Sequence, residues 1–145
     1  MKEITVKNHS KMEGNTTERD NNKFTVKSVI PIEKANKCSI SFVEVEPGNH
    51  AYGYHYHEVN EEAFYIISGT GSVRTKNGDV EVHAGDIITF PTGEEGSHVI
   101  SNSSGTEKLV YIDFGTTSST EIVHFPDTNK VMVVGPYSHG MYDKN

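Results

Sequence analysis

Two histidines separated by one residue stand near the middle of the chain, His55 and His57 in the stretch GYHYHE. On a β-strand alternate side chains point to the same face, so the two imidazoles emerge side by side, about 7 Å apart at their Cα atoms. Imidazole nitrogens are common ligands of divalent metals, and two on one face can converge on a single ion. Taken alone, the pair fits two exposed histidines on a polar edge strand equally well.

A glutamate at the start of the next apolar run strengthens the metal interpretation. In EAFYIIS, Glu62 shares one face of a strand with Phe64 and Ile66. A carboxylate buried on such a face needs a compensating partner, and a metal ion would be that partner. The neighbouring Glu61 has the opposite parity and is expected to face solvent.

Short strands, rather than helices, are expected to position these side chains. From Phe24 onward, apolar or alternating runs recur, each bounded by Gly, Pro, Asn, Asp or Ser, which is typical of an all-β barrel or sandwich. The Asn77-Gly78 pair predicts a two-residue type I′ turn that joins strands 71–76 and 79–83. The expected strands cover 24–30, 38–45, 52–57, 62–68, 72–76, 80–82, 86–90, 97–101, 108–114, 121–125 and 130–134.

The length of 145 residues suits a single domain, because a chain of this size buries one core. Residues 8–23 are polar and lack an apolar period, which favours a loop or flexible arm. We therefore expect a partly flexible N-terminal arm over 1–23, a β-barrel over 24–135 and a C-terminal tail over 136–145.

Composition bears on partners and location. Thirteen basic and twenty acidic residues give a formal charge of −7 without a basic cluster, which argues against nucleic acid and anionic membranes as partners. The sequence has no stretch resembling a signal peptide and no apolar run of the roughly 20 residues that a membrane helix needs, so we expect a cytoplasmic protein. The single cysteine, Cys38, excludes an internal disulfide and every multi-cysteine metal motif.

These residues resemble the first of two motifs of the cupin superfamily. That motif reads Gly, five residues, His-x-His, three or four residues, Glu, six residues, Gly. The chain matches it with His55, His57, Glu62 and Gly69, and the spacing selects Glu62 over Glu61. The upstream glycine lies one residue further away than the motif has it.

The second cupin motif reads Gly, five residues, Pro-x-Gly, two residues, His, three residues, Asn. It is similar to the pattern formed here by Gly85, Pro91, Gly93, His98 and Asn102. Four residues instead of two separate the second glycine from His98, so the chain carries an insertion in this loop. The insertion contains Glu94 and Glu95, which we interpret as a solvated charge pair rather than a general base at the mouth of a site.

The resemblance implies an all-β, cupin-type double-stranded β-helix, a jelly-roll barrel whose inward side chains meet in its interior. It implies a metal site formed by His55, His57, Glu62 and His98. Because nitrogen and oxygen ligands without thiolate suit several metals, the expected cofactor is one divalent transition metal: Mn, Fe, Ni, Co, Cu or Zn.

A substrate pocket is expected beside the metal ligands. Apolar positions on the ligand faces equally fit an ordinary core, and the motif asparagine either orients a ligand or closes a turn. The residues expected to line the pocket are Phe64, Ile66, Phe90, Ile100 and Asn102.

The fold does not select the chemistry, because cupins include dioxygenases, sugar-phosphate isomerases, decarboxylases and binding modules. An intact ligand set with open coordination positions favours a metal-dependent enzyme, such as a dioxygenase acting on a small chelating substrate. The alternatives are a sugar phosphate isomerase, for which no base can be assigned from sequence, and a non-catalytic module that binds metal and a small ligand. The resemblance also implies a homodimer.

Overall fold

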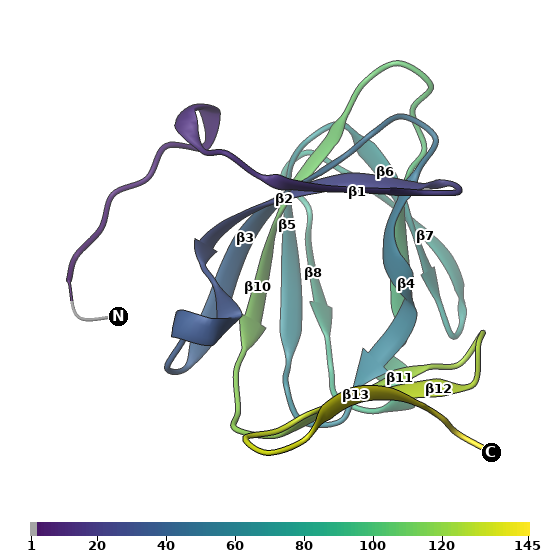
Figure 1. The fold of residues 1–145 in the computed structure, drawn as a ribbon. Helices are drawn as coiled ribbons and strands as arrows, with labels where there is room; N and C mark the ends of the chain where they lie inside the picture. Colours follow the sequence, from purple (N-terminus) through teal and green to yellow (C-terminus); the bar gives the residue numbers. More distant parts are fainter. Residues whose placement is uncertain (1–2) are drawn as a thin grey trace.

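In the computed structural model, which describes residues 3–145, the chain folds into two antiparallel sheets that pack face to face (Figure 1). One sheet has the strand order β1-β2-β3-β10-β5-β8 and the other β13-β12-β11-β4-β9-β6-β7. Strands that are distant in sequence thus become neighbours, and from β3 to β6 and from β7 to β11 each successive strand passes to the other sheet. The expected all-β jelly-roll barrel is confirmed.

The eleven expected strands have bounds within a residue or two of the predicted ranges, whereas β1 and β13, in the segments expected to be an arm and a tail, were not predicted. The first sheet contains β1 (Asn15–Arg19), β2 (Asn22–Ile30), β3 (Cys38–Val45), β5 (Glu62–Ser68), β8 (Ile87–Phe90) and β10 (Leu109–Thr116). The second contains β4 (His50–His57), β6 (Thr70–Thr75), β7 (Gly78–His83), β9 (His98–Asn102), β11 (Glu121–Phe125), β12 (Lys130–Val134) and β13 (His139–Asp143). Short 3-10 turns form η1 (His9–Lys11), η2 (Ile32–Lys34) and η3 (Glu94–Gly96). Within residues 3–145, no helix has the length and apolar character needed to cross a membrane.

Strand β1 forms inside the segment that was expected to be a loop or flexible arm. Its residues, NTTER, pair with β2 across a turn in which Asp20 adopts a φ of 54°. All of its side chains are exposed, so the strand has no apolar period by which it could be recognised. For residues 15–19 the expectation of a loop is wrong, because backbone pairing with β2 rather than burial holds this stretch in place.

Strands β6 and β7 form the predicted hairpin, but its turn differs from the prediction. Thr75 pairs with Gly78, which leaves Lys76 and Asn77 as the central residues. Gly78 has a φ of 110°, whereas Asn77 keeps a negative φ. A type I′ turn needs a positive φ at both central residues, which Asn77 does not have. In this turn the positive φ belongs to the glycine that follows the two central residues. The predicted pairing of the strands is confirmed, and the predicted turn type is wrong.

The hydrophobic core lies between the two sheets. Ile66, Leu109 and Tyr111 are fully buried there. The core also contains the four apolar residues that were expected to line a pocket, namely Phe64, Ile66, Phe90 and Ile100. The core therefore packs directly against the polar side chains that were predicted to bind a metal.

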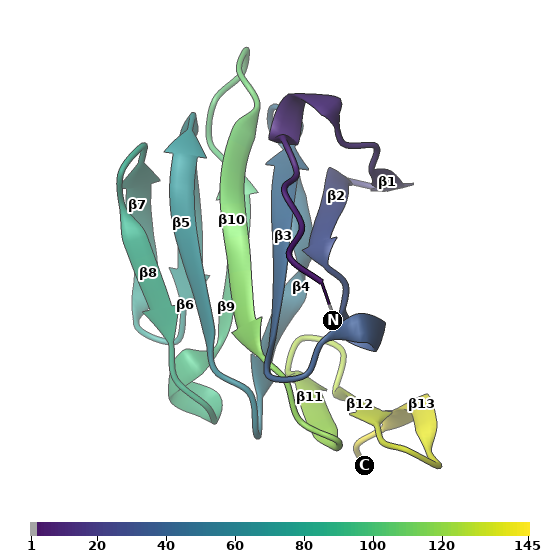
Figure 2. The same cartoon turned by 90° about the vertical axis from the view of Figure 1, so that its left-hand side faces the viewer.

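The outer face of the six-stranded sheet carries large apolar side chains that remain exposed. Figure 2 looks onto this face, where the N-terminal segment runs alongside β3 and His9 stacks on Phe42 with ring centroids 4.5 Å apart. The exposed apolar residues on β5, β8 and β10 are Tyr65, Ile67, Ile87 and Phe114. This exposed apolar face is compatible with the predicted homodimer, which stays a prediction.

Candidate metal centre

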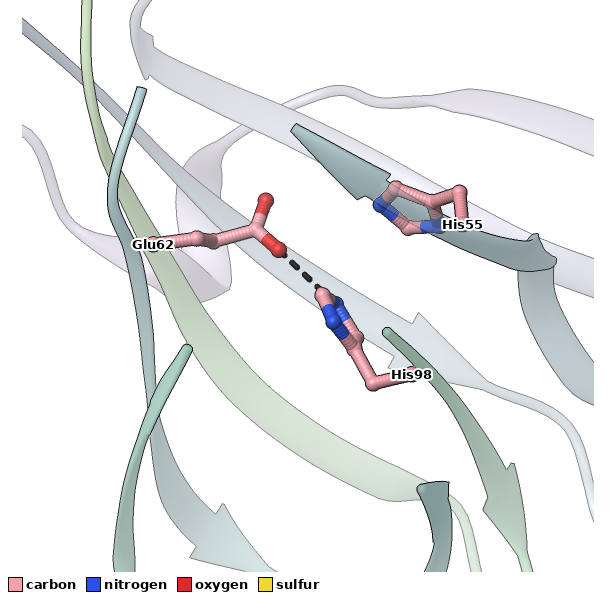
Figure 3. Close-up of side chains that lie close together, drawn as sticks. All are labelled: His55, Glu62 and His98. Carbon is pink, nitrogen blue, oxygen red and sulfur yellow. Dashed lines mark ion pairs between the residues drawn. The ribbon is translucent and has the colours of Figure 1, made fainter. Parts of the chain in front are cut away.

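Predicted metal ligands from three strands meet at one end of the barrel. His57 is the last residue of β4, whereas Glu62 and His98 are the first residues of β5 and β9. Because β4 and β9 run antiparallel, with His55 opposite His98, these strand ends come together. One ligand atom from each of His55, Glu62 and His98 lies within 4.8 Å of the others (Figure 3).

His57 lies at the edge of this group. Its Nε2 is 3.8 Å from Oε2 of Glu62, and its ring centroid is 5.1 Å from that of His55. The strand alternation that places His55 and His57 on one face is therefore present in the structure. All four residues predicted to bind a metal are close together.

Backbone carbonyls orient two of the imidazoles. Nδ1 of His55 donates a hydrogen bond to the carbonyl oxygen of Gly53 at 2.7 Å, and Nδ1 of His98 donates to that of Gly96 at 2.8 Å. A carbonyl oxygen can only accept, so Nδ1 carries the proton in both rings. In the neutral ring Nε2 then keeps its lone pair, which is the arrangement a metal-binding histidine needs.

Burial keeps these two imidazoles neutral. It lowers the pKa of His55 to about 3, with the neighbouring His98 adding to the effect. Burial also lowers the pKa of His98 to about 4. Near neutral pH both rings are consequently in the form that binds metal.

The facing atoms of Glu62 and His98 fit a bound cation. Oε1 of Glu62 lies 2.9 Å from Nε2 of His98, yet neither atom has a hydrogen-bond partner. Since Nδ1 of His98 holds the ring proton, two lone-pair atoms point at each other, which is unfavourable unless a cation or a proton lies between them. Both ring nitrogens of His57 are also buried without a hydrogen-bond partner. These orphaned nitrogen and oxygen atoms fit a divalent transition metal.

A second buried carboxyl group lies beside Glu62 and was not found from sequence. Asp113 lies on β10, two residues before the partner of Glu62 in the sheet, and its carboxyl lies beside that of Glu62. Burial and the charge of Glu62 raise the pKa of Asp113 well above its usual range, and burial raises the pKa of Glu62 to about 7. The sequence signal that could have found it is strand alternation. Asp113 lies two residues from the buried Tyr111 and so shares its face of the strand, just as Glu62 shares that of Phe64.

Glu121 is the other site-adjacent acid that sequence reasoning missed. It is only 7% exposed, and its Oε2 lies 3.5 Å from Nδ1 of His57. Nothing local marks it, because a charged residue that follows a Ser/Thr-rich loop resembles a solvated strand end. The two other acids considered near the site, Glu94 and Glu95, are exposed and pair with Lys76, as expected of a solvated loop. Glu61 is exposed too, in agreement with its parity.

The four apolar residues expected to line a pocket form two groups: two aromatic residues that contact His98 and two isoleucines that lie in the core. Phe90 stacks on the His98 ring with centroids 3.6 Å apart, and Phe64 meets it edge-on at 5.5 Å. Ile66 and Ile100 lie in the core, at 0% and 2% exposure. Only the two aromatic residues of this set are seen to contact a proposed ligand ring, so they are the better candidates for the lining.

Asn102 holds a turn together. Its Nδ2 donates to the carbonyl oxygens of Val45 at 2.9 Å and Glu107 at 2.7 Å, and its Oδ1 accepts from the backbone N–H of Ser104 at 2.9 Å. Of the two roles left open from sequence, these contacts favour closing a turn over orienting a metal ligand.

Asn102→Ala is accordingly expected to lower the free energy of unfolding by about 1–3 kcal/mol, because it leaves buried backbone groups without partners. Urea denaturation measures this loss, and elemental analysis should find unchanged metal content. Asn77→Ala, in the exposed hairpin turn, is the control and should change stability by no more than about 0.5 kcal/mol. Loss of metal without loss of stability would instead assign Asn102 to the metal centre.

Comparisons with known proteins agree with this fold. Residues 41–115 match the family model described as a cupin domain. The oxalate-binding protein of Thermotoga maritima is 35% identical over 65 residues, which make up 45% of this chain and 51% of that protein. The match therefore spans about half the length of this curated relative.

Two solved structures superpose over nearly the whole chain. A protein from Acidithiobacillus ferrooxidans that is proposed to be a sugar phosphate isomerase has a TM-score of 0.83 and 27% identity, covering 97% of this chain and 90% of its own. A sugar phosphate isomerase from Silicibacter pomeroyi has a TM-score of 0.84 and 16% identity, covering 97% of this chain and 93% of its own. The second likeness shows the fold alone.

Proposed function

The chain belongs to the cupin domain family, and on that basis we propose that it is a metal-dependent enzyme that isomerises a small hydroxy-carbonyl compound of the sugar phosphate type. The metal would be one divalent transition ion held by His55, His57, Glu62 and His98. The observation that carries the proposal is the convergence of three of these residues within 4.8 Å, with orphaned nitrogen and oxygen atoms facing one another. The likeness to the protein from Acidithiobacillus ferrooxidans, over 97% of this chain and 90% of that one, supports the choice of isomerisation.

The chain's own residues prepare the site for a chelating substrate. Three neutral imidazoles and one carboxylate leave a bound divalent ion with net positive charge, which suits an oxygen-rich ligand. When bound, the ion polarises a carbonyl or hydroxyl oxygen of the substrate as a Lewis acid. The carbonyls of Gly53 and Gly96 keep His55 and His98 oriented, and Phe90 covers one face of the His98 ring.

Isomerisation also requires a group that moves a proton, and Asp113 is our candidate. Its carboxyl is buried beside Glu62, and it is not one of the proposed ligands. Burial and the charge of Glu62 raise the pKa of Asp113, so its ionised form is a stronger base than a free carboxylate and is suited to take a proton from one substrate carbon and return it to the next. This residue answers the objection, raised by the sequence alone, that an isomerase would lack a base.

Anaerobic turnover of sugar phosphates tests the proposal. Purified protein, reconstituted separately with Mn, Fe, Co, Ni and Zn, would be incubated with aldose and ketose phosphates in D₂O and followed by NMR. We expect interconversion with deuterium incorporated at the exchanging carbon, and loss of both on chelation of the metal. Absence of conversion and of deuterium exchange with every metal would overturn the proposed reaction.

The same assay separates the isomerase from the dioxygenase that the ligand set also permits. A dioxygenase consumes oxygen, so an oxygen electrode and a panel of catechol, flavonol and diketone compounds would detect it. Metal-dependent oxygen consumption without anaerobic turnover would favour the dioxygenase.

A second candidate function is the binding of a small dicarboxylate without turnover. The observation that favours it is the 35% identity to an oxalate-binding protein over 65 residues. A net positive metal centre suits a bidentate carboxylate ligand. Calorimetric titration of oxalate into the metal-loaded protein tests this candidate, which gains support if binding is strong and no substrate is converted.

A further inference from the structure

A buried carboxylate from the C-terminal part of the chain reaches the proposed metal centre. Glu121 is the first residue of β11, the neighbour of β4 in the seven-stranded sheet, and it lies beyond residues 41–115 that match the family model. Its side chain is 9% exposed. A charged group this buried requires specific partners.

Backbone donors stabilise this carboxylate. Oε1 accepts from the backbone N–H groups of Val59 at 3.0 Å and Ile122 at 2.9 Å, and Oε2 accepts from that of Asn60 at 2.8 Å. Val59 and Asn60 belong to the connection between β4 and β5, the two strands that carry three of the proposed ligands. Glu121 therefore ties β11 to the connection that sets the spacing of these ligands.

The His57 ring lies between two carboxylates. Its Nδ1 is 3.5 Å from Oε2 of Glu121, and its Nε2 is 3.8 Å from Oε2 of Glu62. His55 and His98 differ, because the Nδ1 atom of each is held by a backbone carbonyl of its own segment. Nδ1 of His57 has no hydrogen-bond partner, and the carboxylate oxygen 3.5 Å from it belongs to a strand more than sixty residues further along the chain.

We propose that Glu121 is the positioning residue for His57: it accepts the Nδ1 proton, so that Nε2 keeps its lone pair and faces the metal centre. The inference rests on the metal site proposed above. A carboxylate behind a metal-binding histidine fixes the ring and its tautomer, and it makes the ligating nitrogen a better donor. Loss of such a partner typically weakens metal binding by about 10–100-fold.

The tautomer of His57 tests the proposal without any metal. In long-range ¹H–¹⁵N spectra of the metal-free protein at neutral pH, we expect His57 to carry its proton on Nδ1. Glu121→Gln should shift protons to Nε2, whereas Glu44→Gln, at a partly buried carboxylate paired with Lys27, should not. An unchanged tautomer in Glu121→Gln overturns the proposal, and Glu121→Asp provides the same readout if the glutamine variant does not fold.

Metal affinity supplies a second readout. Calorimetric titration with Mn²⁺ should show about 10–100-fold weaker binding for Glu121→Gln and unchanged binding for Glu44→Gln. In a His57→Ala background Glu121→Gln should cause no further loss, because its effect passes through His57. An equal loss in both backgrounds would mean that Glu121 only stabilises the connection between β4 and β5. If the unaltered protein bound no metal, the proposed function would fail, while the tautomer would still decide the role of Glu121.

Discussion

Replacing His98 is expected to abolish stoichiometric binding of a divalent metal. His98 is 1% exposed, its tautomer is fixed by Gly96, and its Nε2 lies 2.9 Å from the carboxylate of Glu62. Removal of this nitrogen takes away a proposed ligand atom that lies directly opposite the carboxylate of Glu62. We expect a larger loss of affinity than the roughly 10–100-fold caused by losing an outer partner of a ligand. Elemental analysis after reconstitution and dialysis measures metal content, and calorimetry measures affinity.

Two substitutions separate binding from packing at this position. His98→Ala also removes a ring that stacks on Phe90, so it lowers stability as well as metal binding. His98→Phe keeps a ring of similar shape but has no ligand atom, and it should lose the metal while losing less stability. Glu61→Gln, at the exposed neighbour of Glu62, is the matched control and should retain full metal content. A metal that survives in His98→Phe would contradict the assigned site.

Asp113→Asn is expected to reduce the isomerase kcat by about 10²–10⁴-fold, the range typical of a lost general acid or base. Asparagine keeps the shape and polarity of the side chain, but it cannot take up a proton. Metal content should therefore stay the same while turnover and deuterium exchange at the substrate carbon fall together. Anaerobic steady-state kinetics and NMR measure these quantities.

A partly buried acid on the outer side of the barrel serves as the comparison for Asp113. Glu44 pairs with Lys27 at 2.6 Å on the outer side of β3, and Glu44→Gln should leave kcat unchanged. If Asp113→Asn retained the original kcat with full metal content, another group would have to move the proton. If it lost its metal, Asp113 would instead belong to the support of Glu62.

Most strands could be predicted from sequence because their signals are local. Alternation of apolar and polar residues and the bounding turn residues lie within each strand, so β3, β5, β11 and β12 have the expected bounds. The same alternation placed Glu62 rather than Glu61 toward the interior. Where a strand is held by pairing alone, as β1 is, no local signal exists. The hairpin between β6 and β7 differs from β1, because its strand pairing could be predicted from sequence. Its turn type could not, because it depends on the backbone conformation that Gly78 adopts.

The sequence by itself determined the all-β class, because strand signals are properties of short segments. Its resemblance to the two cupin motifs implied the jelly roll and the four candidate metal ligands. Only the tertiary structure decided which other acids reach the site. Asp113 faces Glu62 because β10 pairs with β5 in one particular register, and Glu121 faces His57 because β11 lies beside β4. The first pair is about fifty positions apart in the sequence and the second more than sixty, so both depend on the pairing of distant strands and on the core packed between the sheets.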